Sequence, residues 1–270
     1  MSDCHRGDGN WNDNFSANGN IYYAALNYYY RRQFTYFELG DGDELWENRR
    51  LSDIIETHSN VYWMLYKFMK DNRAYFICGN HDKVKLNHKY FERNIMKAAE
   101  DTGKDFIKEL KRIRFYESIV LTHDLYKRDI LLIHGNQGDF LNDYMWASTR
   151  FMVRYLWQPL ESYGVKDPTR TGKNYKRRQD TENRISRWVK DNKCMVIAGH
   201  THRPVFPKTD GIPYFNDGSC VHPRCITAIE IEQGFITLVK WQVQTGNSGV
   251  LYIGKEILAG PERLNQFITL

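Results

Sequence analysis

Short apolar runs that end in a glycine or histidine next to further polar residues recur along this chain. They occupy residues 34–39, 74–78, 130–133 and 194–198. Each is rich in β-branched and aromatic residues and is four to six residues long, which is typical of a buried strand. Because parallel strands end at one edge of a sheet, the polar residues that follow these runs are expected to gather there.

Helical spacing fills much of the chain between and after these runs. It covers residues 20–32, 59–72, 83–112 (with an interruption near 101–103) and 140–163. Residues 113–121 and 130–133 read as a strand pair, and residues 225–232 and 235–243 as a final hairpin. Strands that alternate with helices before a hairpin predict an α/β sandwich, and no internal repeat is visible.

Length and composition set the outer bounds. With 270 residues, of which 41% are hydrophobic, the chain can bury one sizeable core, so we expect a single domain over residues 1–270. No apolar run approaches 18 residues, and the N-terminus does not resemble a signal peptide. The five cysteines form no C-x-x-C pair, which favours reduced thiols and a cytoplasmic location.

The polar clusters at the strand ends contain metal-competent side chains. Asp, Asn and His supply oxygen and imidazole ligands for a divalent cation, and no cysteine cluster competes with them. The candidates are Asp3, His5, Asp41, Asn80, His134, His200 and His202. Any one histidine alone is more often a hydrogen-bonded core or turn residue, but the ordered set predicts a two-metal site.

These clusters form five motifs, in order DxH, GDxxE, GNHD, HG and GHTH, and the set resembles the calcineurin-like metallophosphoesterase superfamily. The resemblance spans residues 3–202 and extends to about Trp241. A finer resemblance is to the branch of UDP-2,3-diacylglucosamine pyrophosphohydrolase, carried by residues 40–46, 134–140, 199–204 and 216–219. Protein Ser/Thr phosphatases carry Asp-Arg-Gly where this chain has Glu44-Leu45-Trp46, which counts against that class.

The resemblance implies a fold and a ligand assignment. The fold is a metallophosphoesterase-type β-sandwich flanked by helices, with an inserted helical lid over residues 140–193. One metal would take Asp3, His5, Asp41 and His202, and the other Asp41, Asn80, His134 and His200, with Asp41 as the bridge. The i, i+2 pairs, Asp3 with His5 and His200 with His202, are expected to share one side of extended backbone. The two ions would be divalent, with Mn²⁺ favoured over Fe or Zn²⁺.

The resemblance also assigns catalytic roles. His81 would contact phosphate beside Asn80 and act as general acid, oriented by Asp82. The lipid branch typically has arginine at the position of His81, and this departure weakens the finer assignment. The implied activity is metal-dependent hydrolysis of a phosphodiester or pyrophosphate, of nucleotide-sugar or lipid-linked type, by a hydroxide that the two metals activate. The alternative is a nuclease or phosphomonoesterase acting on nucleic acid or nucleotides.

Positive charge is concentrated between the fourth and fifth motifs. Residues 166–193 contain ten Lys or Arg and four Asp or Glu, a net +6 in a chain that nets +5. We interpret this segment as part of a basic lid that binds an anionic substrate through Arg177 and Arg178. A solvated helix face and a nucleic-acid track are the alternatives. Arg6 could clamp a phosphate or form a surface salt bridge.

Two further features stand outside the motifs. In the superfamily a strand precedes the DxH motif, but only Met1 and Ser2 precede Asp3. We expect a truncated start, because Asp3 and His5 would otherwise lie on a fraying terminus. His58, His88, His123 and His222 match no motif and are interpreted as structural. The assignment is least secure for His222, which follows Gly218-Ser219 at the predicted edge of the site.

Overall fold

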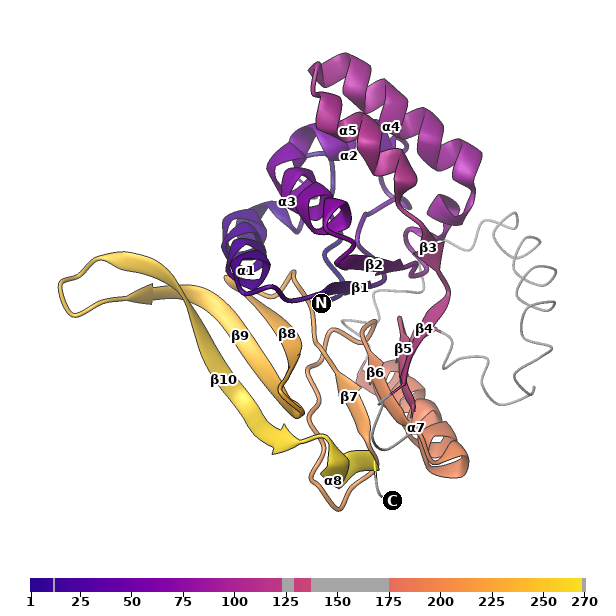
Figure 1. The fold of residues 1–270 in the computed structure, drawn as a ribbon, viewed down its shortest axis with the longest axis vertical. Helices are drawn as coiled ribbons and strands as arrows, with labels where there is room; N and C mark the ends of the chain where they lie inside the picture. The colour runs from indigo at the N-terminus through magenta and orange to yellow at the C-terminus, as the bar shows by residue number, and fades with distance from the viewer. Residues whose placement is uncertain (12, 123–128, 137–174, 269–270) are drawn as a thin grey trace.

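The computed structural model describes residues 1–11, 13–122, 129–136 and 175–268 (Figure 1). The helix predicted over residues 140–163 and the first part of the predicted lid lie outside these residues. Side chains are described from Arg178 onward in the last segment. None of the helices within these ranges is long and apolar enough to cross a membrane.

The first sheet is parallel and carries the second and third motifs. Its order is β1 (Tyr36–Leu39), β2 (Ala74–Ile77) and β3 (Phe115–Tyr116). The helices beside it are α1 (Gly19–Arg31), α2 (Leu51–Thr57), α3 (Ser59–Lys70), α4 (His88–Thr102) and α5 (Asp105–Glu109). Their apolar faces bury Leu26, Ile55 and Leu65 in a common core, as the helical spacing predicted for α1 and α3.

The second sheet carries the fourth and fifth motifs. Its order is β4 (Ser118–Thr122), β5 (Asp129–Ile133), β6 (Met195–Ala198) and β7 (Tyr214–Asn216), with β5, β6 and β7 parallel. Helix α7 (Tyr175–Asn192) packs on this sheet through Ile185 and Val189. Because α7 leads directly into β6, its N-terminal end lies at the carboxyl edge of the sheet.

A third, antiparallel sheet completes the mixed α/β architecture. It consists of β8 (Cys225–Glu232), β9 (Phe235–Thr245) and β10 (Leu251–Arg263), and the β9–β10 hairpin projects from the molecule (Figure 1). The sequence pattern did not predict β10, whose run contains Gly254, Gly260 and Pro261. It forms because β9 offers a long partner edge, and α2, β7 and the short α8 (Asn265–Ile268) were likewise not predicted.

The core between the sheets places the strand ends together. Leu39 and Ile77 of the first sheet pack in one cluster with Ile130, Leu132 and Ile197 of the second. The carboxyl ends of β1, β2, β5 and β6 therefore meet at one edge, as the sequence predicted. Short 3-10 turns at Ser16–Asn18, Lys83–Leu86 and Leu110–Arg112 complete the connections.

The first residues of the chain run beside the end of β1. Leu39 N–H donates to the Met1 carbonyl at 2.8 Å, and Asp3 N–H donates to the Gly40 carbonyl at 3.0 Å. His5 N–H donates to the Asp41 carbonyl at 2.9 Å. Asp3 and His5 are therefore buried and hydrogen-bonded into the fold, and the fraying that we considered for them does not occur.

Candidate metal centre

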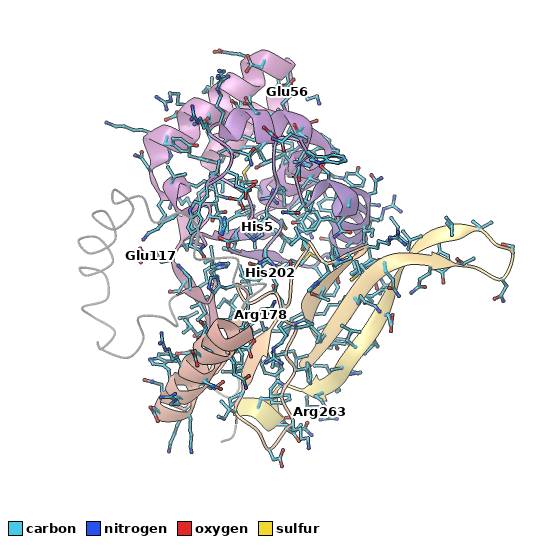
Figure 2. All side chains as sticks on the ribbon, turned by 180° about the vertical axis from the view of Figure 1, so that it is seen from behind. His5, Glu56, Glu117, Arg178, His202 and Arg263 are labelled. Atoms are coloured by element: carbon cyan, nitrogen blue, oxygen red, sulfur yellow. The ribbon has the colours of Figure 1, made fainter. Side chains whose placement is uncertain are left out.

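The first ligand group consists of Asp3, His5 and His202, which come from the two ends of the matched motifs. His202 Nε2 lies 3.0 Å from Asp3 Oδ1 and 3.3 Å from His5 Nε2. The three candidate ligand atoms lie within 4.8 Å of one another. Figure 2 shows His5 and His202 near the middle of the molecule, where the helical half meets the sheets. This spacing suits a shared cation.

The second ligand group consists of Asp41, His134 and His200, all of them buried. Asp41 Oδ2 lies 3.1 Å from His134 Nε2 and 3.8 Å from His5 Nε2. One carboxylate oxygen therefore faces histidines of both groups. The bridging role of Asp41, which the resemblance implies, would use this position.

The ligand pairs converge for a different reason than predicted. Extended backbone was expected to place each i, i+2 pair on one side, but Asp3, His5, Asp41, His200 and His202 have φ angles of 51°, 46°, 50°, 68° and 53°. This left-handed conformation costs a non-glycine residue on the order of 1–3 kcal/mol. As a result, His200 lies in the second ligand group and His202 in the first, so the fifth motif contributes to both groups.

Glycines make room for these ligands. A Cβ on Gly79 would collide with Asp41 Oδ1, and a Cβ on Gly199 would lie 2.6 Å from Asp3 Oδ2. Glycine lets the backbone pass close to other atoms because it has no Cβ. In the structure, the atoms that approach are the ligand side chains themselves.

His81 is positioned by Glu44, although Asp82 was predicted for this role. Glu44 Oε1 lies 2.8 Å from His81 Nδ1, and the Trp46 ring stacks on the His81 ring with centroids 4.0 Å apart. Asp82 points elsewhere: it accepts hydrogen bonds from the backbone N–H groups of Gly42 and Gly79 at 3.0 and 2.8 Å. The prediction for Asp82 was wrong, because its carboxylate ties together the turns that follow β1 and β2.

The part of the chain that contains the five motifs also matches a known protein family. The sequence model of the calcineurin-like phosphoesterases matches residues 1–204. The chain belongs to the calcineurin-like phosphoesterase family. This family consists of dinuclear metal-dependent hydrolases of phosphoester bonds, so the chain is an enzyme of that general kind.

Similarity to individual known proteins is low. Vps29 of Chaetomium thermophilum is similar over 83% of this chain and 80% of its own, with 9% sequence identity and a TM-score of 0.37. No curated protein sequence matches the chain. The family is therefore defined by the sequence model, and the substrate is not.

Several ligand atoms of this calcineurin-like phosphoesterase fit divalent cations because they are buried and make no hydrogen bond within the described parts of the chain. Among the described residues, Asp3 Oδ1, His134 Nε2 and both polar side-chain atoms of Asn80 are buried without a hydrogen bond. Buried polar groups are normally satisfied, and an unsatisfied one requires an explanation such as an ion. Asn80 is only 5% exposed and directly precedes His81, whose backbone N–H donates to Asp41 Oδ1 at 2.9 Å, so its amide oxygen is a candidate neutral ligand beside the second group.

The ring nitrogens opposite the ligand atoms are anchored. His134 Nδ1 lies 2.8 Å from the Leu39 carbonyl oxygen, and His5 Nδ1 lies 2.9 Å from Glu44 Oε2. An acceptor on Nδ1 fixes the tautomer that directs the Nε2 lone pair toward a metal. Asp3 Oδ2 accepts from the backbone N–H of His200 at 2.8 Å, which leaves Oδ1 for coordination.

The electrostatics of the centre favour positive charge. Burial lowers the pKa of His134, but the Asp41 carboxylate outweighs this effect and raises the pKa to about 9. Burial, followed by the nearby His134, lowers the pKa of His200 to about 3, so this imidazole stays in its neutral, ligating form. The carboxylates thus stabilise cationic charge, which divalent ions would supply.

Arg6 does not reach the substrate side of the centre. It is 1% exposed, and its guanidinium donates to both carboxylate oxygens of Glu38 at 2.9 and 3.0 Å and to Asp43 at 2.7 Å. Both readings of Arg6 from the sequence were wrong, because it forms neither a phosphate clamp nor a surface salt bridge. Three of its N–H groups donate to carboxylates beneath the ligand turns.

The ion pairs of Arg6 extend into a buried network that sequence reasoning missed. Lys85 Nζ lies 3.0 Å from Asp43 and 2.5 Å from Asp82, and Tyr62 Oη donates to Asp43 at 2.7 Å. The sequence signal that could have revealed this network is the group of polar residues next to the second and third motifs. The network fixes the turns that carry Asp41 and Asn80.

The predicted lid residues are placed only in part. Arg178 lies at the end of α7 nearest His202 (Figure 2), whereas the side chain of Arg177 lies outside the described residues. Glu182 accepts from Thr201 Oγ1 and Arg203 Nε, both at 3.0 Å, so α7 is tied to the fifth motif. From Glu182 onward, α7 packs on the second sheet.

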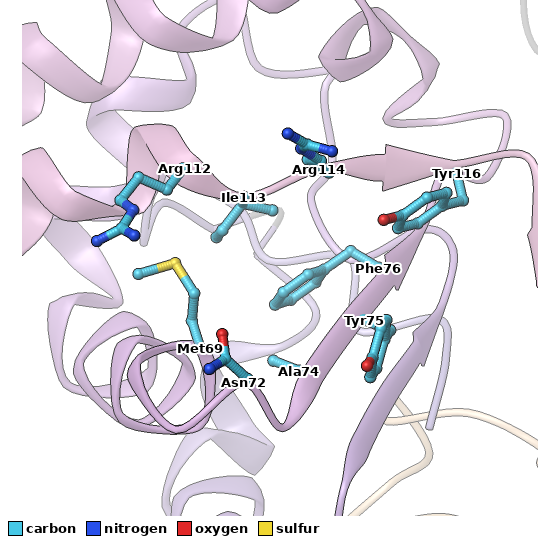
Figure 3. Close-up of a pocket in the computed structure, with 9 residues that line it drawn as sticks. All are labelled: Met69, Asn72, Ala74, Tyr75, Phe76, Arg112, Ile113, Arg114 and Tyr116. Atoms are coloured by element: carbon cyan, nitrogen blue, oxygen red, sulfur yellow. The ribbon is translucent and has the colours of Figure 1, made fainter.

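A depression in the surface lies apart from the metal centre. Its lining includes Met69, Tyr75, Phe76, Arg112 and Tyr116, at the ends of α3, β2 and β3 (Figure 3). None of its lining residues is a ligand candidate or a neighbour of His81. The depression therefore has no part in the phosphoesterase site.

Proposed function

We propose that this enzyme holds two divalent cations in the ligand sets expected from its motifs. One set is Asp3, His5, Asp41 and His202, and the other is Asp41, Asn80, His134 and His200. The observation that carries this assignment is the position of Asp41 Oδ2, which faces both His134 and His5. We favour Mn²⁺, because mixed carboxylate, amide and imidazole ligands suit it.

Different residues of the chain have different roles in the proposed phosphoester hydrolysis. When bound, two divalent cations supply Lewis acidity and neutralise charge on the transferring phosphoryl group. His81 donates a proton to the leaving oxygen, and the Glu44 carboxylate stabilises its imidazolium form through Nδ1. The neutral Asn80 amide keeps negative charge low beside the incoming phosphate.

The proposed substrate is a phosphodiester or pyrophosphate of the nucleotide-sugar or lipid-linked type. The motifs at residues 40–46, 134–140, 199–204 and 216–219 support the branch of UDP-2,3-diacylglucosamine pyrophosphohydrolase. His81, where that branch typically has arginine, argues for a different member of the substrate class. The +6 segment at residues 166–193 supports an anionic substrate.

The proposed lid is modified by the position of α7. We retain residues 140–193 as the inserted segment, but substrate contact is proposed only for its part up to the first turn of α7. Arg177 and Arg178 belong to that part. The remainder of α7 packs through Ile185 and Val189, so it serves as a support.

A substrate panel with Mn²⁺ tests the proposed substrate class. It comprises para-nitrophenyl phosphate, its bis ester, a UDP-sugar, a cyclic nucleotide and single-stranded DNA. Faster turnover of the bis ester or UDP-sugar than of the monoester is expected. Preference for DNA, with steeply salt-dependent binding, would favour the nuclease alternative. Preference for the monoester would favour a phosphomonoesterase.

A further inference from the structure

The loop that follows β7 lies against the first ligand group. Cys220 N–H donates to the Asp3 carbonyl at 3.2 Å, and Ser219 Oγ donates to the same oxygen at 3.2 Å. His222 follows two residues later and bridges to Cys225 at the start of β8. The fold thus carries His222, which belongs to no motif, to the neighbourhood of the centre.

Asn18 holds this loop from the inside. It is 1% exposed, and its side-chain nitrogen lies 2.9 Å from the Cys220 carbonyl oxygen, 2.7 Å from that of His222 and 3.2 Å from that of Cys225. A buried amide that contacts three carbonyls of one loop fixes its backbone. His222 is therefore held in place before any ligand binds.

The His222 side chain has a polar atom without a protein partner. Its Nε2 is buried and makes no hydrogen bond within the described part of the chain. Burial, followed by the charge of His202, lowers the pKa of His222, and Arg178 acts in the same direction. The imidazole thus has a nitrogen that makes no hydrogen bond to the described residues, and it lies within electrostatic reach of His202 and Arg178.

Arg178 comes from a different element, the N-terminal end of α7. It precedes Glu182 by about one helical turn. Glu182 accepts a hydrogen bond from Thr201, which stands between His200 and His202. A guanidinium supplies charge and paired donors for phosphate oxygens, whereas a neutral imidazole N–H supplies a single directed donor. These two groups are complementary to one anionic tetrahedral group.

We propose that His222 and Arg178 form a subsite for the second phosphate of a diphosphate substrate, on the His202 side of the centre. This inference rests on the proposed function, and it narrows the substrate class to pyrophosphate esters. In the subsite, His222 donates from Nε2 to an oxygen of the non-transferred phosphate, and Arg178 neutralises its charge. A monoester lacks this group and leaves the subsite unused.

Calorimetric titration of the Mn²⁺-saturated protein tests the subsite without turnover. The probes are inorganic pyrophosphate and inorganic phosphate, at one fixed Mn²⁺ concentration so that chelation affects every variant equally. His222→Ala and Arg178→Ala should each weaken pyrophosphate binding by about tenfold, the usual effect of losing one hydrogen bond to a charged group. Phosphate binding should change less than twofold.

Two controls separate recognition from loss of structure. His222→Gln, which keeps a donor, should recover part of the pyrophosphate affinity, and His88→Ala, at an exposed histidine on α4, should change neither affinity. Equal losses for phosphate and pyrophosphate, or no loss for either, would overturn the subsite. If the variants lose pyrophosphate affinity but not phosphate affinity, while the enzyme turns over no UDP-sugar, the proposed substrate class is refuted and the subsite still stands.

Discussion

Glu44 Oε1 lies 2.8 Å from His81 Nδ1, while Oε2 of the same carboxylate lies 2.9 Å from His5 Nδ1. One side chain thus joins a metal-ligand candidate to the proposed general acid. Burial opposes ionisation of Glu44, but the hydrogen bonds from His5 and His81 lower its pKa to about 2, so it is a carboxylate at neutral pH. We therefore expect metal binding and proton transfer to be coupled through Glu44.

Replacing Glu44 tests this coupling. Glu44→Gln keeps the size of the side chain and removes its charge, so it should lower both kcat and the affinity for metal, each by about 10–100-fold. Steady-state kinetics at saturating Mn²⁺ and equilibrium dialysis measure the two effects separately. Unchanged metal affinity together with unchanged kcat would show that the contact is only structural.

His81→Ala should affect proton transfer alone. The variant should keep both metals and lose about 10²–10⁴-fold in rate, the usual contribution of a positioned acid. The loss should be smaller for para-nitrophenyl esters, because their leaving group departs without a proton. Rates measured with a series of leaving groups check this, and equal losses on good and poor leaving groups would contradict the role.

Asp41→Asn should abolish activity by removing the charge shared between the two ligand groups. The purified enzyme is expected to bind two divalent ions per chain, and the variant fewer, because the carboxylate faces both His134 and His5. Elemental analysis after dialysis measures the metal content. One ion or none per fully active chain would refute the dinuclear assignment for these residues.

Arg6→Met should destabilise the fold without contacting substrate. The change leaves Glu38 without its guanidinium partner in a buried site, and breaking such a pair costs about 3–5 kcal/mol. Chemical denaturation measures the loss. The double change Arg6→Met with Glu38→Gln should recover part of the stability, and a fully stable single variant would show that the network is dispensable.

The Asp13–His58 pair predicts an acid limit of stability away from the centre. Burial raises the pKa of Asp13, but the hydrogen bond to His58 at 2.8 Å outweighs it and lowers the pKa to about 2. A depressed carboxyl pKa contributes stability that is present above its unfolded value near 3.8 and is lost as the pH falls toward 2.

Asp13→Asn should remove this contribution. Since the pair is only partly shielded from solvent, we expect a loss of about 1–2 kcal/mol at pH 7 and a smaller loss near pH 2. Urea denaturation of both proteins across that range gives the difference. A difference that does not depend on pH would mean that the charge of Asp13 does not contribute.

The sequence by itself determined the family and the ligand candidates. Four of the five motifs place a metal-competent residue next to a short buried run, and this local pattern predicts both the strands and the polar residues at their ends. The helices α1, α3 and α4 follow in the same way from their apolar spacing. Strands with a weak sequence pattern, such as β7 and β10, could not be predicted in this way, because pairing with neighbouring strands stabilises them.

Only the tertiary structure decided which polar groups meet. Asp82 and Arg6 stand beside motif residues in the sequence, yet their side chains turn beneath the ligand turns and satisfy backbone and buried charges. Glu44 reaches His81, which lies 37 positions away, because β1 and β2 are parallel neighbours. Left-handed backbone at ligand candidates such as Asp41 and His202 sets the directions of the ligand side chains, and sequence spacing does not encode this conformation for non-glycine residues.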